Sequence, residues 1–358
     1  MANGAVLGQI PKGGMAAELI VYKISGVAPS NVTATNKDTG EVLQINVESN
    51  RYKFLAYNYG NYEVSYSIGD KQPVKEDIVV DVCKQYIVTV AGNPDLNSNS
   101  WADISEVSSK GLASSIWSVG DAKEIELNGT IAELSLSNYK TWVYILGFNH
   151  NSEREGSNLI HFGCFRNGKD YTLQNSVALV DSRYNYGNSG NYFVMNDSGT
   201  NNGGWESCDM RNTVINANAI SPSQATSGSF LAVLPNDLKT VLKQCKKYTC
   251  NRSSGTDDKE SYINYTQDWA FLLSEFEVLG QRFYASQYEQ EYQKQYEYYK
   301  LGNSKIKYKQ NSLSDACAWW CRSLGISNEN YFCDIRDDGI SSFSWADVSY
   351  GFAPGFCV

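Results

Sequence analysis

The last stretch of the chain, AWWCRSLGISNENYFCDIRDDGISSFSWADVSYGFAPGFCV (residues 318–358), carries most of the information about the fold. Aromatic residues and cysteine dominate its two ends, AWWCRS (318–323) and GFAPGFCV (351–358). Between these ends, Ser, Asn, Asp and scattered aromatic residues follow neither a helical nor a strand period. We therefore expect two anchors in a hydrophobic core, with the paired tryptophans and Phe356 buried, around an irregular segment that faces outward.

The preceding sequence predicts short elements that pack around this segment. SWADISEVSSKG (100–111) has three apolar residues at helical spacing between a Ser N-cap and a terminal Gly, which predicts a short helix. KEIELNGTIAEL (123–134) reads as a strand, an Asn-Gly turn and a second strand. TWVYILGF (141–148) is a continuous apolar run and predicts a central strand.

Three further motifs complete the region. LPNDLKTVLKQC (234–245) predicts a helix that begins at its Pro. WAFLLSEFEVLG (269–280) must be buried, and EQEYQKQYEYYK (289–300) resembles an amphipathic helix with a Tyr stripe. Long loops rich in Gly, Asn and Ser separate these motifs. We therefore predict an α+β domain over residues 96–358, with few helices and much irregular chain.

The first 95 residues have a different pattern. Runs rich in β-branched and aromatic residues, such as YEVSYSI (62–68), alternate and are separated by turn sequences such as KDTG (37–40). This pattern predicts a small all-β sandwich over residues 1–95, serving for attachment or oligomerisation. The polar, turn-rich stretch NPDLNSNS (93–100) is the best candidate for a linker.

Composition narrows the classes of function. Charged residues make up only 19% of the chain while Tyr occurs 25 times, so the surface depends on Tyr, Ser, Asn and Gly, as binding surfaces do. β-rich extracellular proteins share this composition, so it does not decide alone. A net charge of −9 without a basic block argues against nucleic acid as a partner. With no run of 18 apolar residues we expect no membrane insertion, and we see no secretion signal.

The nine cysteines and two histidines suggest no metal site. Cys245-x4-Cys250 and Cys317-x3-Cys321 match no common zinc spacing, and the histidines are far away in sequence. We expect buried free thiols. His150 and His161 could act as a catalytic base, but no nucleophile elbow accompanies them, and a structural imidazole is the commoner role.

Other candidate sites have ordinary explanations. Carboxylates in GTDDKES (255–261) and CDIRDDG (333–339) could bind Ca²⁺, although solvated loop charges are commoner. Trp319 and Trp320 could stack on sugars or bases, although adjacent tryptophans are more often part of a core. We therefore expect no cofactor, no metal and no catalytic residue.

The order of motifs over about residues 100–358 resembles a known family. The series runs through IWSVGDAKEIELNG (116–129), VYILGFNHN (143–151), GGWESCDMRNTV (203–214), LPNDLKTVLK (234–243), FLLSEFEVLG (271–280), EYQKQYEYY (291–299), WWCRS (319–323) and GFAPGFCV (351–358). It resembles a domain of gut bacteria and phages that is similar to the C-type-lectin-fold variable proteins of diversity-generating retroelements. A more distant similarity is to formylglycine-generating-enzyme-like domains. The N-terminal region resembles generic immunoglobulin-like sandwiches.

This resemblance implies that a rigid lectin-type scaffold displays a variable segment, here residues 315–358, which binds a host receptor. The implied scaffold residues are Trp319, Trp320, Arg322, Ser323, Gly339, Pro354 and Phe356. The implied variable, ligand-binding positions are Leu324, Ile326, Ser327, Asn328, Asn330, Arg336, Ile340, Ser341, Ser342, Phe343, Ser344, Asp347, Ser349 and Tyr350. The family would have Pro after Arg-Ser, where this chain has Leu324.

The expected function is therefore recognition, not catalysis. The resemblance implies an adhesin at the tip of a phage or prophage tail fibre, located in the virion, which binds a protein or glycan on a bacterial surface. Other tail proteins would be partners, and the chain would form a homo-oligomer, with a trimer as one form. Two alternatives stay open: a non-variable structural virion or cell-surface protein with the same fold, and an oxidase-like enzyme related to the formylglycine-generating enzymes. Two isolated histidines argue against the facial iron site of the related oxidases.

Overall fold

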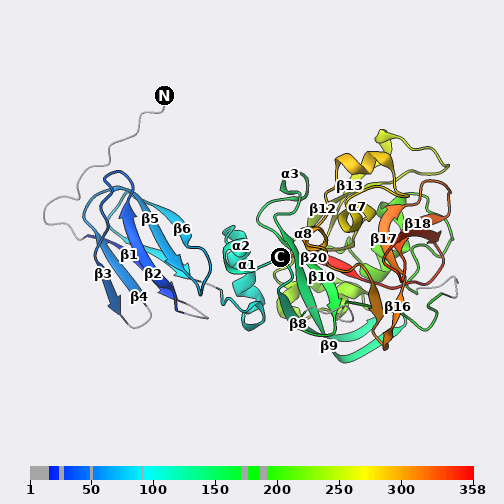
Figure 1. Cartoon of the computed structure of the whole chain (residues 1–358), viewed down its shortest axis with the longest axis horizontal. Helices are drawn as coiled ribbons and strands as arrows, with labels where there is room; N and C mark the ends of the chain where they lie inside the picture. The colour runs from blue at the N-terminus through cyan, green and yellow to red at the C-terminus, as the bar shows by residue number, and fades with distance from the viewer. Residues whose placement is uncertain (1–15, 24–27, 49–50, 91, 171–175, 186–191) are drawn as a thin grey trace. The chain divides into compact units, whose positions relative to one another are not determined.

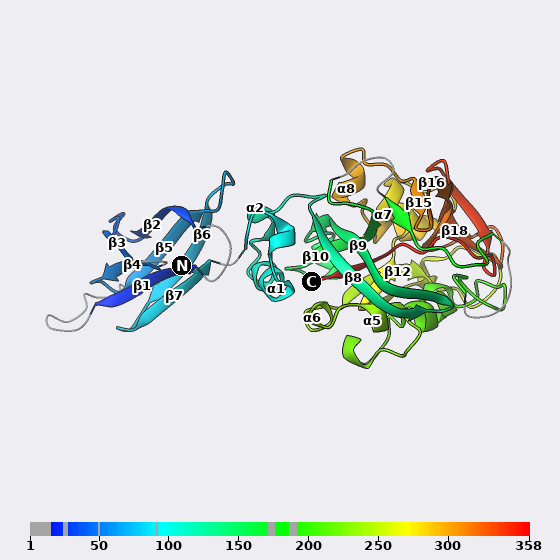
Figure 2. The same ribbon diagram turned by 90° about the horizontal axis from the view of Figure 1, so that it is seen from below.

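The computed structural model describes residues 16–23, 28–48, 51–90, 92–170, 176–185 and 192–358. The chain divides into two compact units, Met1–Trp117 and Ser118–Val358. Figure 1 and Figure 2 show the elements of each unit from two directions. Strands predominate and helices are few and short, which confirms the predicted α+β class.

The described part of the first unit contains seven strands in two sheets. The strands are β1 (Ala17–Lys23), β2 (Ser30–Asn36), β3 (Ile45–Glu48), β4 (Arg51–Ala56), β5 (Gly60–Ser67), β6 (Val74–Val80) and β7 (Gln85–Val90). One sheet has the order β3-β4-β1-β7 and the other the order β2-β5-β6. Only β1 and β7 pair in parallel among these described strands. Alternate residues of β5 are buried, as its sequence predicts.

The predicted short helix is present as α1 (Trp101–Ser109). It begins at Ser100, whose hydroxyl accepts a hydrogen bond from the Asp103 amide at 3.1 Å. The Asp103 carboxylate in turn accepts from the Ser100 amide, so the two residues form a capping box. Gly111 follows with φ +72°, as expected for a residue that ends a helix.

The boundary between the units lies after Trp117, and not at residue 95 as the sequence suggested. The stretch 93–100 is an ordered loop that contains the turn η1 (Leu96–Ser98), and it is not a linker. The carbonyl of Asn93 accepts from the Asn99 side-chain amide (3.0 Å) and from the Trp117 indole N–H (2.8 Å). These bonds tie α1 and α2 (Ala113–Ile116) to the first unit.

The second unit is built on a five-stranded sheet with the order β14-β20-β10-β9-β8. Its strands are β8 (Ala122–Ile131), β9 (Leu134–Phe148), β10 (Ile160–Arg166), β14 (Ala270–Leu272) and β20 (Pro354–Cys357). β9 pairs with strands on both sides, so the predicted central strand is confirmed. β20 inserts between β10 and β14, and every residue of β20 is buried. The last residues of the chain are therefore part of the core.

Smaller sheets and single-turn helices surround this sheet. The sheets are β11-β15-β16, β12-β13 and β17-β18-β19, made of β11 (Val177–Ala178), β12 (Cys245–Cys250), β13 (Ile263–Asp268), β15 (Lys307–Lys309), β16 (Ser312–Cys317), β17 (Trp319–Leu324), β18 (Tyr331–Ile335) and β19 (Ser341–Trp345). The helices are α3 (Ser152–Glu155), α4 (Gly204–Ser207), α5 (Phe230–Val233), α6 (Asn236–Lys239), α7 (Glu275–Leu279) and α8 (Glu297–Lys300). Other helical turns are η2 (Met210–Ile215), η3 (Pro222–Gln224), η4 (Glu260–Tyr262) and η5 (Gln287–Glu291).

Three local predictions are corrected. The Asn-Gly pair at 128–129 does not form the turn, because β8 continues through it with a bulge and the chain reverses at residues 132–133. The helix predicted over 234–245 has only one turn, α6, because Cys245 already begins β12. The stretch 289–300 is not one helix: η5 ends within it, extended chain follows, and α8 takes only its last residues.

Candidate functional site

The segment between the two hydrophobic anchors forms a regular antiparallel sheet. β17, β18 and β19 pair in sequence order, with Tyr331 opposite Trp345, Cys333 opposite Phe343 and Ile335 opposite Ser341. The prediction of an irregular loop is therefore wrong for these strands. The sequence of β18 does not alternate between polar and apolar residues, because buried residues occupy both of its faces.

Aromatic side chains gather at the open end of this hairpin. The ring of Phe343 lies 4.7 Å from that of Tyr331 and 4.8 Å from that of Tyr284, centroid to centroid. The Tyr331 ring meets Trp345 edge-on at 5.4 Å. Trp345 is 49% exposed and Tyr284 is 36% exposed. We call Tyr284, Tyr331, Phe343 and Trp345 the aromatic cluster.

A buried carboxylate positions the aromatic cluster. Glu275, at the start of α7, is fully buried and accepts hydrogen bonds from the amides of Phe283 (2.9 Å), Tyr284 (2.9 Å) and Ala285 (3.0 Å). The same carboxylate accepts from the Ser341 hydroxyl at 2.6 Å. Glu275 therefore holds the loop that carries Tyr284 against β19.

Buried side chains also hold the turn between β17 and β18. The Arg252 guanidinium donates to the carbonyls of Ile326 (2.9 Å) and Asn328 (2.6 Å). The Asn201 amide donates to the carbonyls of Asn328 (2.8 Å) and Tyr331 (2.8 Å). Both donors are 0% exposed, and both contact only main-chain atoms of the turn in these bonds. These bonds hold the turn by its main chain, and among the turn's own side chains Asn328 also takes part, because its Oδ1 accepts from the Asn330 amide at 3.1 Å.

Most of the positions predicted to bind ligand are accessible. Exposed or half-buried side chains are those of Ile326, Ser327, Asn328, Asn330, Arg336, Ile340, Ser342, Phe343, Ser344, Asp347 and Tyr350. Leu324, Ser341 and Ser349 are buried, which contradicts their prediction as outward-facing. The Ser341 hydroxyl is used by Glu275, and the Ser349 hydroxyl donates to Asp181 at 2.7 Å. Leu324 packs at the end of β17, opposite Phe332.

The predicted scaffold residues have structural roles. Trp319, Trp320, Arg322, Ser323, Pro354 and Phe356 are all buried, and Gly339 lies in the turn between β18 and β19. The indole N–H of Trp319 donates to the Lys305 carbonyl (2.9 Å), and that of Trp320 donates to the Phe193 carbonyl (3.0 Å). Both rings are 0% exposed, so the tryptophans belong to the core and are not a stacking surface for sugars.

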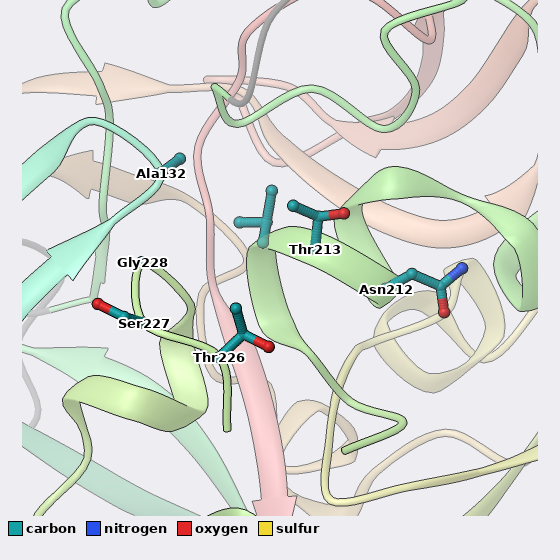
Figure 3. A pocket seen from close by; sticks show the side chains of 7 residues that line it. Ala132, Asn212, Thr213, Thr226, Ser227 and Gly228 are labelled. Atoms are coloured by element: carbon teal, nitrogen blue, oxygen red, sulfur yellow. The ribbon is translucent and has the colours of Figure 1, made fainter. Parts of the chain in front are cut away.

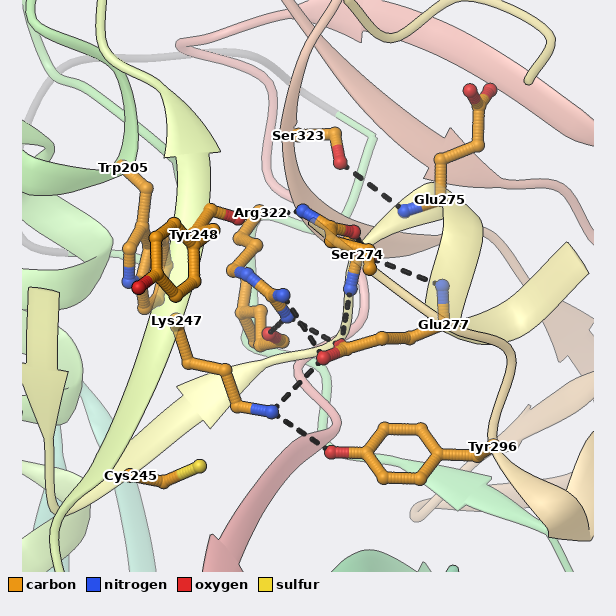
Figure 4. A network of polar contacts seen from close by, with 12 residues as sticks. Trp205, Cys245, Lys247, Tyr248, Ser274, Glu275, Glu277, Tyr296, Arg322 and Ser323 are labelled. Atoms are coloured by element: carbon orange, nitrogen blue, oxygen red, sulfur yellow. Dashed lines mark hydrogen bonds and ion pairs between the residues drawn. The ribbon is translucent and has the colours of Figure 1, made fainter. Parts of the chain in front are cut away.

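A buried ion-pair network lies beneath the sheet (Figure 4). The Glu277 carboxylate of α7 contacts both terminal nitrogens of Arg322, one at 2.9 Å, and also contacts Lys247 Nζ of β12 at 2.9 Å. Lys247 contacts a second buried carboxylate, Glu155, at 2.7 Å. Burial alone would raise the pKa of Glu277, but the charges of Arg322 and Lys247 outweigh it and hold the pKa far below its usual range.

Asp334, on β18, is buried, although the sequence analysis counted it among the solvated carboxylates of CDIRDDG (333–339). It lies opposite Trp320 on one side and Ser342 on the other, and it is 1% exposed. One carboxylate oxygen, Oδ2, has no hydrogen-bond partner among the described residues. Burial raises the pKa of Asp334 to about 7. The only sequence signal was an acidic residue inside the otherwise apolar run YFCDI (331–335).

The sequence suggested that the two histidines are isolated, but they lie close together in the structure. The His150 and His161 ring centroids lie 5.6 Å apart, and both side chains are buried. His161 Nδ1 lies 3.0 Å from the Tyr296 hydroxyl and 3.4 Å from Cys357 Sγ. Burial lowers the pKa of His150 to about 3, so its imidazole is neutral at physiological pH. Histidine and cysteine therefore converge in the core despite their separation in sequence.

In the acidic loops considered for Ca²⁺, several carboxylates bind other groups of the protein. Asp257 pairs with Lys259 at 2.7 Å, and Asp258 accepts from the Ser286 hydroxyl at 2.5 Å. Asp338 accepts from the Ile340 amide at 3.0 Å. In the part of the chain that the structure describes, groups of three or more potential metal ligands occur only in the buried region around His150 and His161.

A surface pocket of ≈ 440 Å³ opens between the β8–β9 turn and η2 (Figure 3). Its lining consists of Ala132, Asn212, Thr213, Val214, Thr226, Ser227 and Gly228. These side chains are small and neutral, and none of them can act as an acid or a base near neutral pH. The pocket therefore offers hydroxyl groups and hydrogen bonds but no acid or base.

Comparison with known families finds one match. The model of a family described as a domain of unknown function (DUF6273) matches residues 174–358, just over half of the chain. The chain belongs to this family. The matched region contains β17, β18, β19 and, from the buried network, Lys247, Glu277 and Arg322, whereas Glu155 lies before it. No curated protein and no solved structure matches the chain. Among the described residues, no helix is long and apolar enough to cross a membrane.

Replacing Glu277 by Gln should destabilise the second unit strongly. The substitution keeps the shape of the side chain but leaves Arg322 and Lys247 without their shared counter-charge in a fully buried site. We expect the free energy of unfolding to fall by about 3–5 kcal/mol. Chemical denaturation followed by tryptophan fluorescence measures this change. Glu297→Gln is the matched control, because its ion pair with Lys300 is exposed and contributes little. Equal effects of the two variants would contradict the proposed role of Glu277.

Replacing Asp334 by Asn should alter the pH dependence of stability. The pKa of Asp334 is about 7 in the folded unit, above that of an unfolded chain. Between about pH 4 and 7 the folded state therefore binds more protons, and its stability falls as the pH rises. Because Asn cannot ionise, Asp334→Asn should gain stability over the wild type as pH rises through this window. Thermal unfolding at both ends of the window tests this. A constant difference between the two proteins would contradict it.

Proposed function

We propose that this chain is a receptor-binding protein whose ligand-binding face is the β17–β18–β19 sheet with the aromatic cluster. The observation that carries the proposal is the way the backbone is held. Arg252 and Asn201 bind main-chain carbonyls of the β17–β18 turn, and Glu275 binds main-chain amides beside β19. Exposed side chains on this face can therefore change without loss of the fold.

The face also has the composition of a binding surface. Its aromatic side chains are partly exposed and pack against one another, so they lose little conformational entropy when a ligand covers them. Small polar side chains such as Ser327, Ser342 and Ser344 surround them and can adapt their hydrogen bonds. Rigid aromatic anchors among adaptable polar groups suit a protein or glycan partner.

The biological setting of this proposal rests on the resemblance of the motif series. We propose a C-type-lectin-like second unit of the retroelement-diversified type, displayed at a phage or prophage tail tip and directed at a bacterial surface molecule. The first unit would be an immunoglobulin-like attachment domain. Display of several copies, as in a trimer, would strengthen weak single contacts.

Binding is favoured over the two alternatives. A purely structural protein has no need of exposed, mutually packed aromatic residues, which are costly in contact with water. An enzyme needs catalytic groups within reach of a substrate, whereas His161 is 0% exposed and His150 6% exposed.

The binding proposal is tested with fluorescently labelled full-length protein on a panel of intact gut bacteria, read by flow cytometry. We expect Phe343→Ser and Trp345→Ser to weaken binding about tenfold or more, because central aromatic residues usually carry the binding energy. Ile220→Ser is the matched control, since Ile220 is 89% exposed but lies outside the face. The proposal would be contradicted if both aromatic variants bound as well as the wild type, or if Ile220→Ser lost as much binding as they did.

A further inference from the structure

Four potential metal ligands from four separate elements meet in the core of the second unit. They are Glu155 of α3, His161 of β10, Cys245 of β12 and Cys357 of β20. Each is at most 3% exposed. The ligand atoms of His161, Cys245 and Cys357 all lie within 4.8 Å of one another. This convergence was invisible to a search for spacing motifs, because each ligand comes from a different part of the chain.

The distances fit a tetrahedral site. Zinc–sulfur bonds of about 2.3 Å and zinc–nitrogen or zinc–oxygen bonds of about 2.0–2.2 Å place neighbouring ligand atoms about 3.4–3.8 Å apart. Cys357 Sγ lies 3.4 Å from His161 Nδ1, and Cys245 Sγ lies 3.5 Å from Glu155 Oε2. His161 Nδ1 and Glu155 Oε2 are 3.9 Å apart. Three edges of the tetrahedron are therefore close to the expected length.

We propose that His161, Cys245 and Cys357, with Glu155 as the fourth ligand, bind one metal ion of the zinc type. Two thiolates and an imidazole select a borderline-soft ion with tetrahedral preference, and they disfavour Ca²⁺ and Mg²⁺. Four protein ligands close the coordination sphere, which is typical of a structural site and not of a catalytic one.

The charges of the surroundings balance such an ion. Glu155 and Glu277 are matched by Lys247 and Arg322, which contact them directly. An ion with two positive charges then replaces the two thiol protons, which leave to solvent, so the buried charge is unchanged. Lys247 Nζ also contacts the Tyr296 hydroxyl at 3.0 Å, and that hydroxyl lies 3.0 Å from His161 Nδ1. Figure 4 shows the Lys247 ammonium between the Glu277 carboxylate and the Tyr296 hydroxyl, with Cys245 near it. Lys247 would thus orient Glu155 from outside the coordination sphere, while the Tyr296 hydroxyl would release His161 Nδ1 to the ion and keep its bond to Lys247.

The neighbouring group of His150, Glu155 and Glu277 is a weaker candidate. The Glu277 carboxylate is already held by Arg322 and Lys247, so it could bind an ion only by giving up these buried partners. In the cluster with two cysteines Lys247 likewise holds Glu155, but this cluster also offers two sulfur atoms, which lie against Glu155 and His161.

The proposed ion would fasten the end of the chain. Cys357 is the penultimate residue, and β20 pairs with β10 and β14. An ion would join β20 to β12 and α3 as well. The site would stabilise the core on which the β17–β18–β19 sheet rests, and it does not depend on the proposed receptor binding.

The test uses untagged full-length protein, with elemental analysis and Co²⁺ as a spectroscopic probe. We expect about one zinc-type ion per chain and, after exchange for Co²⁺, a thiolate-to-cobalt charge-transfer band with tetrahedral d–d bands. Cys357→Ala should lose the charge-transfer intensity, and His161→Gln should weaken Co²⁺ binding. Cys208→Ala is the matched control, because Cys208 is an equally buried free thiol that contacts the Trp205 carbonyl instead.

Three results would overturn the proposal. They are metal-replete protein with well under one ion per chain, a cobalt spectrum without thiolate ligation, and equal metal content in Cys357→Ala and Cys208→Ala. If Cys357→Ala does not fold, the cobalt spectrum of the wild-type protein still decides, because it reports thiolate ligation directly.

Discussion

The second unit depends on one buried carboxylate, that of Glu277. It lies on α7 and meets Arg322 from β17 and Lys247 from β12, with no exposure to water. The capping box of α7 uses the same side chain, which accepts from the Ser274 amide at 2.9 Å. Because an unpaired charge in this place would cost several kcal/mol, the three elements must come together for any of them to be stable. The first strand of the candidate face is therefore fixed to the core by electrostatics as well as by packing.

This arrangement explains how a face can be rigid and still tolerate change. Arg322 ties β17 to the Leu272 carbonyl of β14. Arg252 and Asn201 bind carbonyls of the turn that follows β17. Glu275 binds amides of the loop beside β19. All of these side chains are buried polar groups with specific partners, and such groups favour a unique packing. The outward side chains of Ile326, Ser327 and Ser342 take no part in these bonds. In the proposed receptor binding, buried side chains hold the backbone and outward side chains contact the ligand.

The sequence predicts features that depend on neighbouring residues better than features that depend on residues far apart along the chain. The aromatic ends of the C-terminal segment indicated burial correctly, because hydrophobic patterning is a local signal. Ser341 and Ser349 looked like outward polar residues, but their partners Glu275 and Asp181 are distant in sequence. In the same way, His161 and Cys357 meet only because β20 pairs with β10. Polar residues are buried when a distant partner satisfies them, and a single sequence does not show that partner.

The central claim is that buried side chains hold the backbone of the candidate face more firmly than its exposed side chains do. The most direct test compares the thermal unfolding midpoint of two variants. One replaces the outward residues Ile326, Ser327 and Ser342 together by Ala, and the other is the single change Arg252→Met. The account predicts that the triple variant unfolds within a few degrees of the wild type, because surface changes usually cost little. Arg252→Met should unfold at a clearly lower temperature. The reverse order of the two midpoints would contradict the account.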